Sequence, residues 1–296
     1  MSLRKIHILR RVVQLISFLL IPGLFAVTFA ACGQIMQILV RNQQSWAALR
    51  DPIGVLLITF PVTMIFGRFF CGWFCAFGAT EDFFWFLGRA LRFPEIRMSP
   101  RADDLMKKIK YFLFMLFVAV FWPGLIRIAP NASPWRAFLR VANIAHWPGF
   151  MPLMNFGGLL LVIILILSMF GERFFCRYLC PMGAIFSPLS RIRYLHIRKP
   201  QKKCGDCRKC TDVCPSGIQL YELNKVKSGE CINCLQCVEE CPKKNAQMKP
   251  HPVVAIILSI ALITGLYLLN ENHIHSVVGA AAAGQHPIIY DTSRDS

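Results

Sequence analysis

The sequence predicts an all-α polytopic membrane protein with about five transmembrane helices and two repeated helical hairpins, carrying a small inserted α+β domain. Three observations predict this class. The chain of 296 residues is 55% hydrophobic, more apolar than an ordinary soluble domain. Its Lys and Arg are concentrated in a few segments, and most of its 13 cysteines fall into repeated patterns.

Five apolar stretches are long enough to cross a bilayer. We expect these spans at residues 12–40, 52–70, 110–128, 156–175 and 253–270. The first span contains Pro22 and Gly23, and we expect a kink there that neighbouring helices can tolerate.

The charge pattern predicts the orientation. If the N-terminus is inside, residues 1–11, 68–110 and 171–250 hold 27 of the 33 Lys and Arg on the inner side. This bias follows the positive-inside rule. We therefore expect a multi-pass protein of the bacterial inner membrane, with a cytoplasmic N-terminus and an extracytoplasmic C-terminus. The net charge of +17 then reflects topology and contact with anionic membrane lipids, not nucleic acid.

One cysteine spacing occurs twice in the inner segment. Cys204, Cys207, Cys210 and Cys214 are followed by Pro215, and Cys231, Cys234, Cys237 and Cys241 are followed by Pro242. Both runs read C-x₂-C-x₂-C-x₃-C-P, the bacterial ferredoxin run that holds two [4Fe-4S] clusters. The inserted domain is therefore predicted to be a cytoplasmic ferredoxin domain.

The geometry of this run predicts which cysteines share a cluster, because the fourth cysteine of each run ligates the neighbouring cluster. We assign Cys204, Cys207, Cys210 and Cys241 to cluster 1, and Cys231, Cys234, Cys237 and Cys214 to cluster 2. Structural zinc is the alternative, but zinc sites usually separate two C-x₂-C pairs by a dozen or more residues. Disulfides are disfavoured in the reducing cytoplasm.

A second duplication lies in the membrane part. Residues 68–79 match residues 173–184 at a constant offset, and each copy contains a C-x₃-C pair. The two copies predict parallel repeats of one helical hairpin. We accordingly divide the chain into a first repeat (1–105), a second repeat (106–197), the ferredoxin domain (198–250), and a fifth helix with a short outer tail (251–296).

The two pairs, Cys71 with Cys75 and Cys176 with Cys180, have several interpretations. On a helix, residues i and i+4 share one face, so each pair can present two sulfurs together. Four thiolates at the repeat interface would form a further metal or iron–sulfur site, or a redox-active dithiol set. The structural alternative is four small buried residues, because free cysteine is often buried.

Absent motifs narrow the chemistry. The sequence has no phosphate-binding loop, no dinucleotide fingerprint and no nucleophile–base arrangement, so we assign no catalytic residue. None of the seven histidines lies within a predicted span, which speaks against a transmembrane b-type haem.

With these motifs in place, the chain resembles the membrane polyferredoxin family, whose members include proteins of the NapH, NosR and MauN types. The resemblance covers both hairpins with their C-x₃-C pairs and both ferredoxin runs. It departs at Ala76, where the second copy has Pro181, and in the fifth span with its outer tail. The resemblance implies electron transfer from the quinol pool across the membrane to a periplasmic respiratory partner.

The expected function is a membrane-bound iron–sulfur electron-transfer protein. It would pass electrons between quinone, or a cytoplasmic donor, and an extracytoplasmic flavoprotein, ferredoxin or c-type cytochrome. The resemblance leaves open whether the chain is a quinol dehydrogenase subunit of such a complex. The alternative is an accessory factor for the assembly of a membrane or periplasmic metalloenzyme, because cytochrome-oxidase accessory polyferredoxins share this architecture.

Overall fold

Helices dominate the structure, and one small sheet accompanies them. The computed structural model describes residues 3–20, 22–40, 46–96, 98–121, 133–142, 154–200, 204 and 207–249. The elements are α1 (Leu3–Leu20), α2 (Leu24–Val40), α3 (Trp46–Phe66), α4 (Phe69–Trp73), α5 (Ala76–Ala90), α6 (Pro100–Leu116), the π-helix η1 (Phe117–Phe121), α7 (Pro134–Ala142), α8 (Phe156–Phe170), α9 (Phe174–Tyr178), α10 (Pro181–Ser190), β1 (His196–Arg198), α11 (Lys209–Asp212), the 3₁₀ helix η6 (Leu220–Glu222), α12 (Gln236–Glu239) and β2 (Gln247–Lys249).

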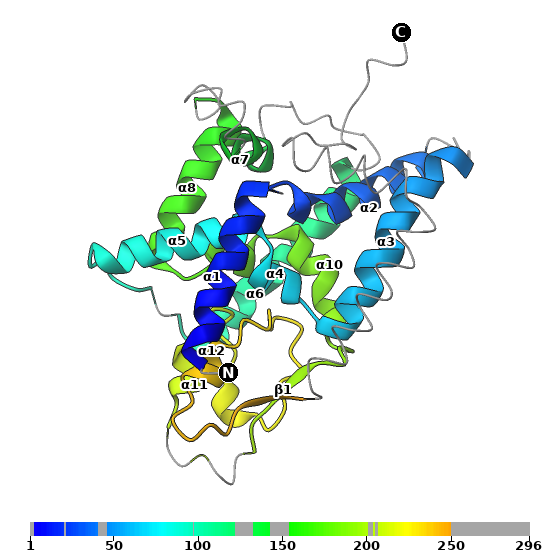
Figure 1. The fold of residues 1–296 in the computed structure, drawn as a ribbon. Coiled ribbons are helices and arrows are strands. Elements are labelled where there is room, and N and C mark those ends of the chain that lie inside the picture. Colours follow the sequence, from blue (N-terminus) through cyan, green and yellow to red (C-terminus); the bar gives the residue numbers. More distant parts are fainter. Residues whose placement is uncertain are drawn as a thin grey trace.

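The long helices and the cysteine-rich segment occupy different ends of the molecule (Figure 1). Helices α1, α3 and α8 run upright in this view, and residues 196–249 lie beneath them. The first turns of α1 reach this lower end, where α1 contacts α12. The start of the described chain and the ferredoxin runs are therefore on the same side, as the charge pattern predicts.

The two copies of the repeated sequence form equivalent elements. Helices α3, α4 and α5 of the first copy correspond to α8, α9 and α10 of the second. Helix α5 packs against α8, and α10 packs against α3. Each copy therefore places its third helix on the first helix of the other copy, so the two repeats interlock around a shared centre.

The predicted spans are shorter or more broken than the hydropathy suggests. The span 12–40 is interrupted after Leu20, so that α1 has 18 residues and α2 has 17; Pro22, which cannot donate the helical hydrogen bond, lies in this break. Helix α8, in the span 156–175, has 15 residues and ends at Gly171, whose backbone is extended.

Two other spans fall on α3 and on α6 with η1. The fifth span, 253–270, and the outer tail lie outside the described residues. Within the part of the chain that the structure describes, no helix has both the length and the apolar content needed to cross a membrane. The number of transmembrane helices stays a prediction.

The cysteine-rich segment is held together by a two-stranded antiparallel sheet and a small core. Strand β1 pairs with β2, with Ile197 opposite Met248. Ile197, Leu220 and Val226 are buried against the cysteines, so the apolar side chains and the thiols share one core.

This segment docks on the ends of α3 and α4. The backbone N–H of Leu195 donates to the carbonyl of Ile65 at 2.9 Å, and the Trp73 indole donates to the carbonyl of Asn233 at 3.1 Å. The Asn233 amide in turn donates to the Phe66 carbonyl at 2.5 Å. These contacts place the ferredoxin runs directly under the C-x₃-C pairs.

Candidate iron–sulfur sites

The eight cysteines of the ferredoxin runs are carried by two similar turns. The third cysteine of each run lies on a short helix, Cys210 on α11 and Cys237 on α12. These two helices contact one another. The remaining six cysteines lie in the loops on either side of them.

The structure brings together three of the four cysteines predicted for cluster 1. Asn245 donates from its side-chain amide to the Cys204 sulfur and from its backbone N–H to the Cys241 sulfur, both at 3.3 Å. Cys210 lies close enough to both thiols to interact with them electrostatically. For Cys207, the fourth member, the assignment stays a prediction.

The four cysteines predicted for cluster 2 line a single cavity. Apolar side chains complete its wall, among them Ile197, Ile218 and Val226. Cys214 comes from the first run, and it lies beside Cys231 and Cys234 of the second. This is the crossed arrangement that the bacterial run predicts.

The cavity suits a cluster chemically. Burial raises the pKa of the Cys214 thiol to about 12, and it also raises the pKa of Cys234, to about 11. A bound metal would hold such buried thiols as thiolates at neutral pH. Backbone N–H groups of Ser216 and Ile218 point at the Cys214 sulfur, which is how proteins support cluster sulfurs.

The C-x₃-C pairs do not lie on one helical face, and this part of the prediction is wrong. Cys71 lies within α4, whereas Cys75 lies beyond its end and is the N-cap of α5, with an extended backbone. Cys176 and Cys180 occupy the same positions in α9 and α10. The Cys75 sulfur accepts a hydrogen bond from the Gly78 N–H at 3.4 Å, whereas the Cys180 side chain makes no such capping bond.

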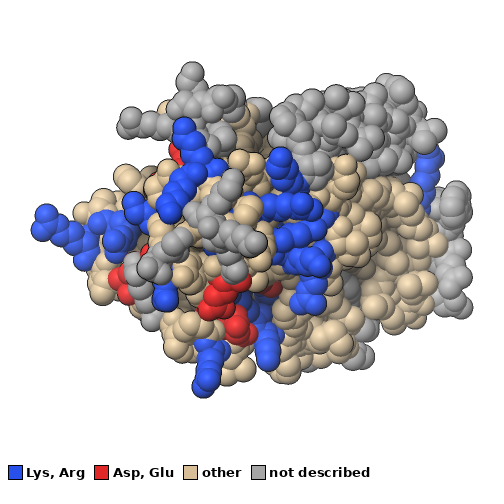
Figure 2. All heavy atoms as spheres, turned by 90° about the horizontal axis from the view of Figure 1, so that it is seen from below, with Lys and Arg blue, Asp and Glu red and all other residues tan. Residues whose placement is uncertain are grey.

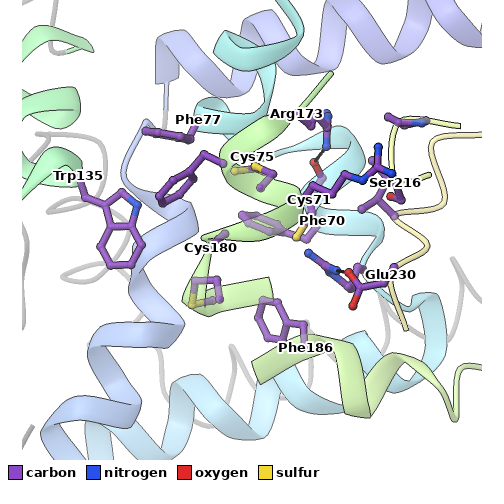
Figure 3. Close-up of a pocket in the computed structure, with 17 residues that line it drawn as sticks. Phe70, Cys71, Cys75, Phe77, Trp135, Arg173, Cys180, Phe186, Ser216 and Glu230 are labelled. Carbon is purple, nitrogen blue, oxygen red and sulfur yellow. Dashed lines mark hydrogen bonds and ion pairs between the residues drawn. The ribbon is translucent and has the colours of Figure 1, made fainter. Parts of the chain in front are cut away.

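All four of these cysteines nevertheless line one cavity (Figure 3). Aromatic side chains cover much of its wall, namely Phe70, Phe77, Trp135, Phe175 and Phe186. The thiols interact electrostatically with one another across the repeats, because Cys75 and Cys71 both lie near Cys180. The structure therefore joins the two pairs into one site; among the described residues, no three His, Cys, Asp or Glu side chains are grouped closely enough to hold a single ion.

Two arginines cross between the repeats at this cavity. Arg68 of the first copy reaches Gly183 of the second, where an added Cβ would lie 2.8 Å from its guanidinium. Arg173 of the second copy reaches Gly78 of the first, with a corresponding distance of 3.4 Å. Arg173 also donates to the Cys71 carbonyl at 2.6 Å.

Each arginine shares one carboxylate with a second cation, and Asp82 is buried whereas Glu230 is half-buried. Glu230 pairs with Arg68 at 3.0 Å and with Lys110. Asp82 pairs with Arg173 and with Arg10, each at 2.6 Å. Burial raises the pKa of both acids, but the cations outweigh it: the pKa of Glu230 falls to about 2, and that of Asp82 falls well below its usual range.

Family models recognise both cysteine systems. A model described as a 4Fe-4S binding domain matches residues 52–94 and 154–202. A second model, described as a 4Fe-4S dicluster domain, matches residues 196–242. The ferredoxin runs of this chain therefore bind [4Fe-4S] clusters.

Named relatives are similar to part of this chain. YccM of Escherichia coli (strain K12) is 33% identical over 193 residues, which cover 64% of this chain and 53% of YccM. The regulatory protein NosR of Pseudomonas aeruginosa is 27% identical over 221 residues, covering 68% of this chain and 30% of NosR. The ferredoxin-type protein NapH of Haemophilus influenzae is 26% identical over 208 residues, covering 65% of this chain and 66% of NapH. The chain is a 4Fe-4S ferredoxin-type protein related to YccM, NosR and NapH.

The chain covers about half the length of YccM and less than a third of NosR. No solved structure matches it. The activities of those longer proteins as wholes are therefore not assigned to this chain.

Several charged residues beside these cavities were not predicted from the sequence. Arg68 and Arg173 did carry a signal, because they begin the two matched segments. Glu230 and Asp82 carried none, since their partners lie far away along the chain: Lys110 is 120 residues from Glu230, and Arg10 is 72 residues from Asp82.

Proposed function

We propose that this chain is a membrane-bound electron-transfer protein with two [4Fe-4S] clusters. It passes electrons between the quinone pool, or a cytoplasmic donor, and an extracytoplasmic redox partner. The observation that carries this proposal is the convergence of Cys214 on the cavity of Cys231, Cys234 and Cys237, because a crossed ligand set is the arrangement of a two-cluster ferredoxin. YccM, which is provisionally named an electron transport protein, agrees with it.

Exposed apolar side chains support attachment to a membrane. Leu57 on α3 is 56% exposed, Phe112 on α6 is 70% exposed, and Ile166 on α8 is 49% exposed. Such side chains recur on several of the long helices, and their exposure to water is unfavourable. Lipid chains would cover them without cost.

Positive charge supports the orientation. Figure 2 shows the molecule from the end where the ferredoxin runs lie, and Lys and Arg are spread over much of this face. Cations next to the inner leaflet interact favourably with anionic lipids. We therefore place this end in the cytoplasm and the electron acceptor on the opposite side.

The test uses the full chain, purified anaerobically in detergent. We expect iron and acid-labile sulfide in the protein and two low-potential cubane signals in a redox titration by electron paramagnetic resonance. Cys207→Ser should remove one signal and Cys234→Ser the other, whereas Cys32→Ser, which alters a thiol outside both sets, should remove neither. A quinol analogue should reduce the clusters, alone or with the redox partner present.

Two results would contradict the proposal. Zinc in place of iron and sulfide would remove the electron-transfer function altogether. Clusters that accept electrons from a chemical reductant but from no quinol, with the partner included, would remove the quinone pool as donor.

A further inference from the structure

Each repeat alone carries too few ligands for an iron–sulfur cluster. The family model of a 4Fe-4S binding domain matches the two hairpins as separate segments, yet each hairpin holds only two cysteines of a C-x₃-C pair. Clusters of this kind are held by four thiolates. The structure resolves this shortage, because both pairs line one cavity.

The cavity has the features of a cluster site. Its volume is about 30 Å³, so the case for a cluster rests on the four thiols that line it. The ligating side chains available are soft thiols, which select iron–sulfur or similar centres. Cys75 accepts a hydrogen bond from the backbone N–H of Gly78, and hydrogen bonds to sulfur stabilise the reduced state of a cluster.

The charges around the cavity complement an anion. Four thiolates around an iron–sulfur core carry net negative charge, which a buried site must balance. Arg68 interacts electrostatically with Cys71 and Cys180. Arg173 interacts in the same way with Cys176.

Both arginines belong to ion-pair groups beside the cavity. Glu230 faces Arg68 and Lys110. Asp82 faces Arg173, Arg10 and Arg11, and Arg173 also lies near the Glu81 and Glu172 carboxyls. Arg68 comes from the first copy and Arg173 from the second, as expected for one centre between the repeats.

The cavity adjoins the site of cluster 2. Pro215, Ser216 and Ile232 line both cavities, so a single wall of residues separates them. At Gly72 the α4 backbone approaches this wall so closely that an added Cβ would lie 2.5 Å from the Ile232 carbonyl. Figure 3 shows Ser216 and Glu230 at the side of the cavity that faces the ferredoxin runs.

We propose that Cys71, Cys75, Cys176 and Cys180 bind a third iron–sulfur centre shared by the two repeats, with Arg68 and Arg173 as its positioning residues. This centre is the relay that exchanges electrons with cluster 2, so the relay role rests on the function proposed above. In each step one electron leaves reduced cluster 2 and enters the oxidised third centre. No bond is formed or broken, and no proton is transferred.

The first test measures composition in the full-length, anaerobically purified protein. Cys75→Ser combined with Cys180→Ser removes one ligand from each repeat and preserves side-chain size. We expect this double variant to lose iron and sulfide relative to wild type and to retain the two signals of the ferredoxin runs. Cys32→Ser is the matched control, and it should keep the full iron content.

The second test measures potential. Arg68→Gln or Arg173→Gln should shift the midpoint of the third centre to a more negative value, because removing a positive charge disfavours reduction. Arg68→Lys should keep the wild-type value, and the two ferredoxin signals should move less than that of the third centre. If a glutamine variant does not fold, the composition test still decides the proposal.

Three outcomes would overturn the third centre. The double serine variant could hold as much iron and sulfide as wild type, the four thiols could hold zinc, or mass analysis could find them joined as disulfides in the anaerobic protein. In each case two intact ferredoxin clusters would leave the proposed electron-transfer function standing, so the two proposals fail separately.

Discussion

Asp82 shows how single residues hold this frame together. Its carboxylate is fully buried on α5 and pairs with Arg10 from α1 and with Arg173, which precedes α9. Gln14 donates to the same oxygen that Arg10 contacts, at 3.1 Å. Three separate parts of the chain therefore meet at one anion, and a buried charge of this kind is stable only while its partners remain.

We expect Asp82→Asn to lower the free energy of unfolding by about 3–5 kcal/mol, because it leaves two buried guanidinium groups without a counter-ion. Asp104→Asn is the control, since Asp104 lies on exposed α6 surface with its side chain 78% exposed; it should change stability by less than about 0.5 kcal/mol. Chemical denaturation of the detergent-solubilised protein measures both. Equal effects of the two substitutions would contradict the role of Asp82.

The pH dependence of this contribution has a defined sign. The neighbouring arginines hold the pKa of Asp82 well below its ordinary value. A depressed pKa adds stability that is present above the ordinary aspartate range, about pH 3.9, and is lost as the pH falls through the folded-state value. The contribution of Asp82 is therefore complete at neutral pH.

The ligands and the charges differ in how far sequence could predict them. The ferredoxin ligand sets follow from local spacing, because three of the four ligands lie within a few residues of one another. The pairing of Asp82 with Arg10 joins residues 72 positions apart, and no local pattern marks it. Arg68 and Arg173 are an intermediate case. The repeated sequence marks them as equivalent residues, and only the fold shows that each reaches the other repeat.

Helices α5 and α8 of the interlocked repeats approach one another closely. At Gly88 of α5 an added Cβ would lie 2.4 Å from the carbonyl oxygen of Met169 on α8 and 3.0 Å from its carbonyl carbon. Backbone atoms cannot move aside as the end of a side chain can. The absence of a side chain at Gly88 thus sets the distance between the two helices.

We expect Gly88→Ala to destabilise the protein by about 1–2 kcal/mol. Overpacking costs about 1–3 kcal/mol, and the better helix propensity of alanine returns about 0.5–1 kcal/mol. Gly171→Ala is the matched control, because the nearest atom to its added Cβ would be Phe174 Cδ2 at an ordinary 3.7 Å. A thermal midpoint for Gly88→Ala equal to that of the control would refute this packing argument.

The helix break inside each C-x₃-C pair explains why one prediction at this scale failed. Residues 69–77 are almost uniformly apolar, so hydrophobic periodicity cannot locate the end of a short helix there. In the structure, the N–H of Cys75 donates to the carbonyl of Phe70 at 3.0 Å, and that of Cys180 donates to Phe175 at 2.9 Å. The break turns the second thiol of each pair toward the shared cavity.

On the scale of the whole molecule, the positively charged side chains and the exposed apolar side chains lie in different regions. The end that carries the ferredoxin runs is rich in Lys and Arg (Figure 2), whereas exposed apolar side chains such as Leu57 and Phe112 lie on the long helices. A bilayer favours this arrangement, with anionic headgroups next to the cations and hydrocarbon next to the helices.

We therefore expect the native protein to stay with membranes through an alkaline carbonate wash and to be released only by detergent. Trypsin should cut at the exposed Lys243 and Lys244 in inverted vesicles but not in right-side-out vesicles, because the positive end faces the cytoplasm. A variant with both lysines changed to Gln should lose that cleavage product and keep its membrane attachment. Release by carbonate would contradict the lipid-covered helices, and cleavage at these lysines in intact right-side-out vesicles would reverse the orientation and place the clusters outside.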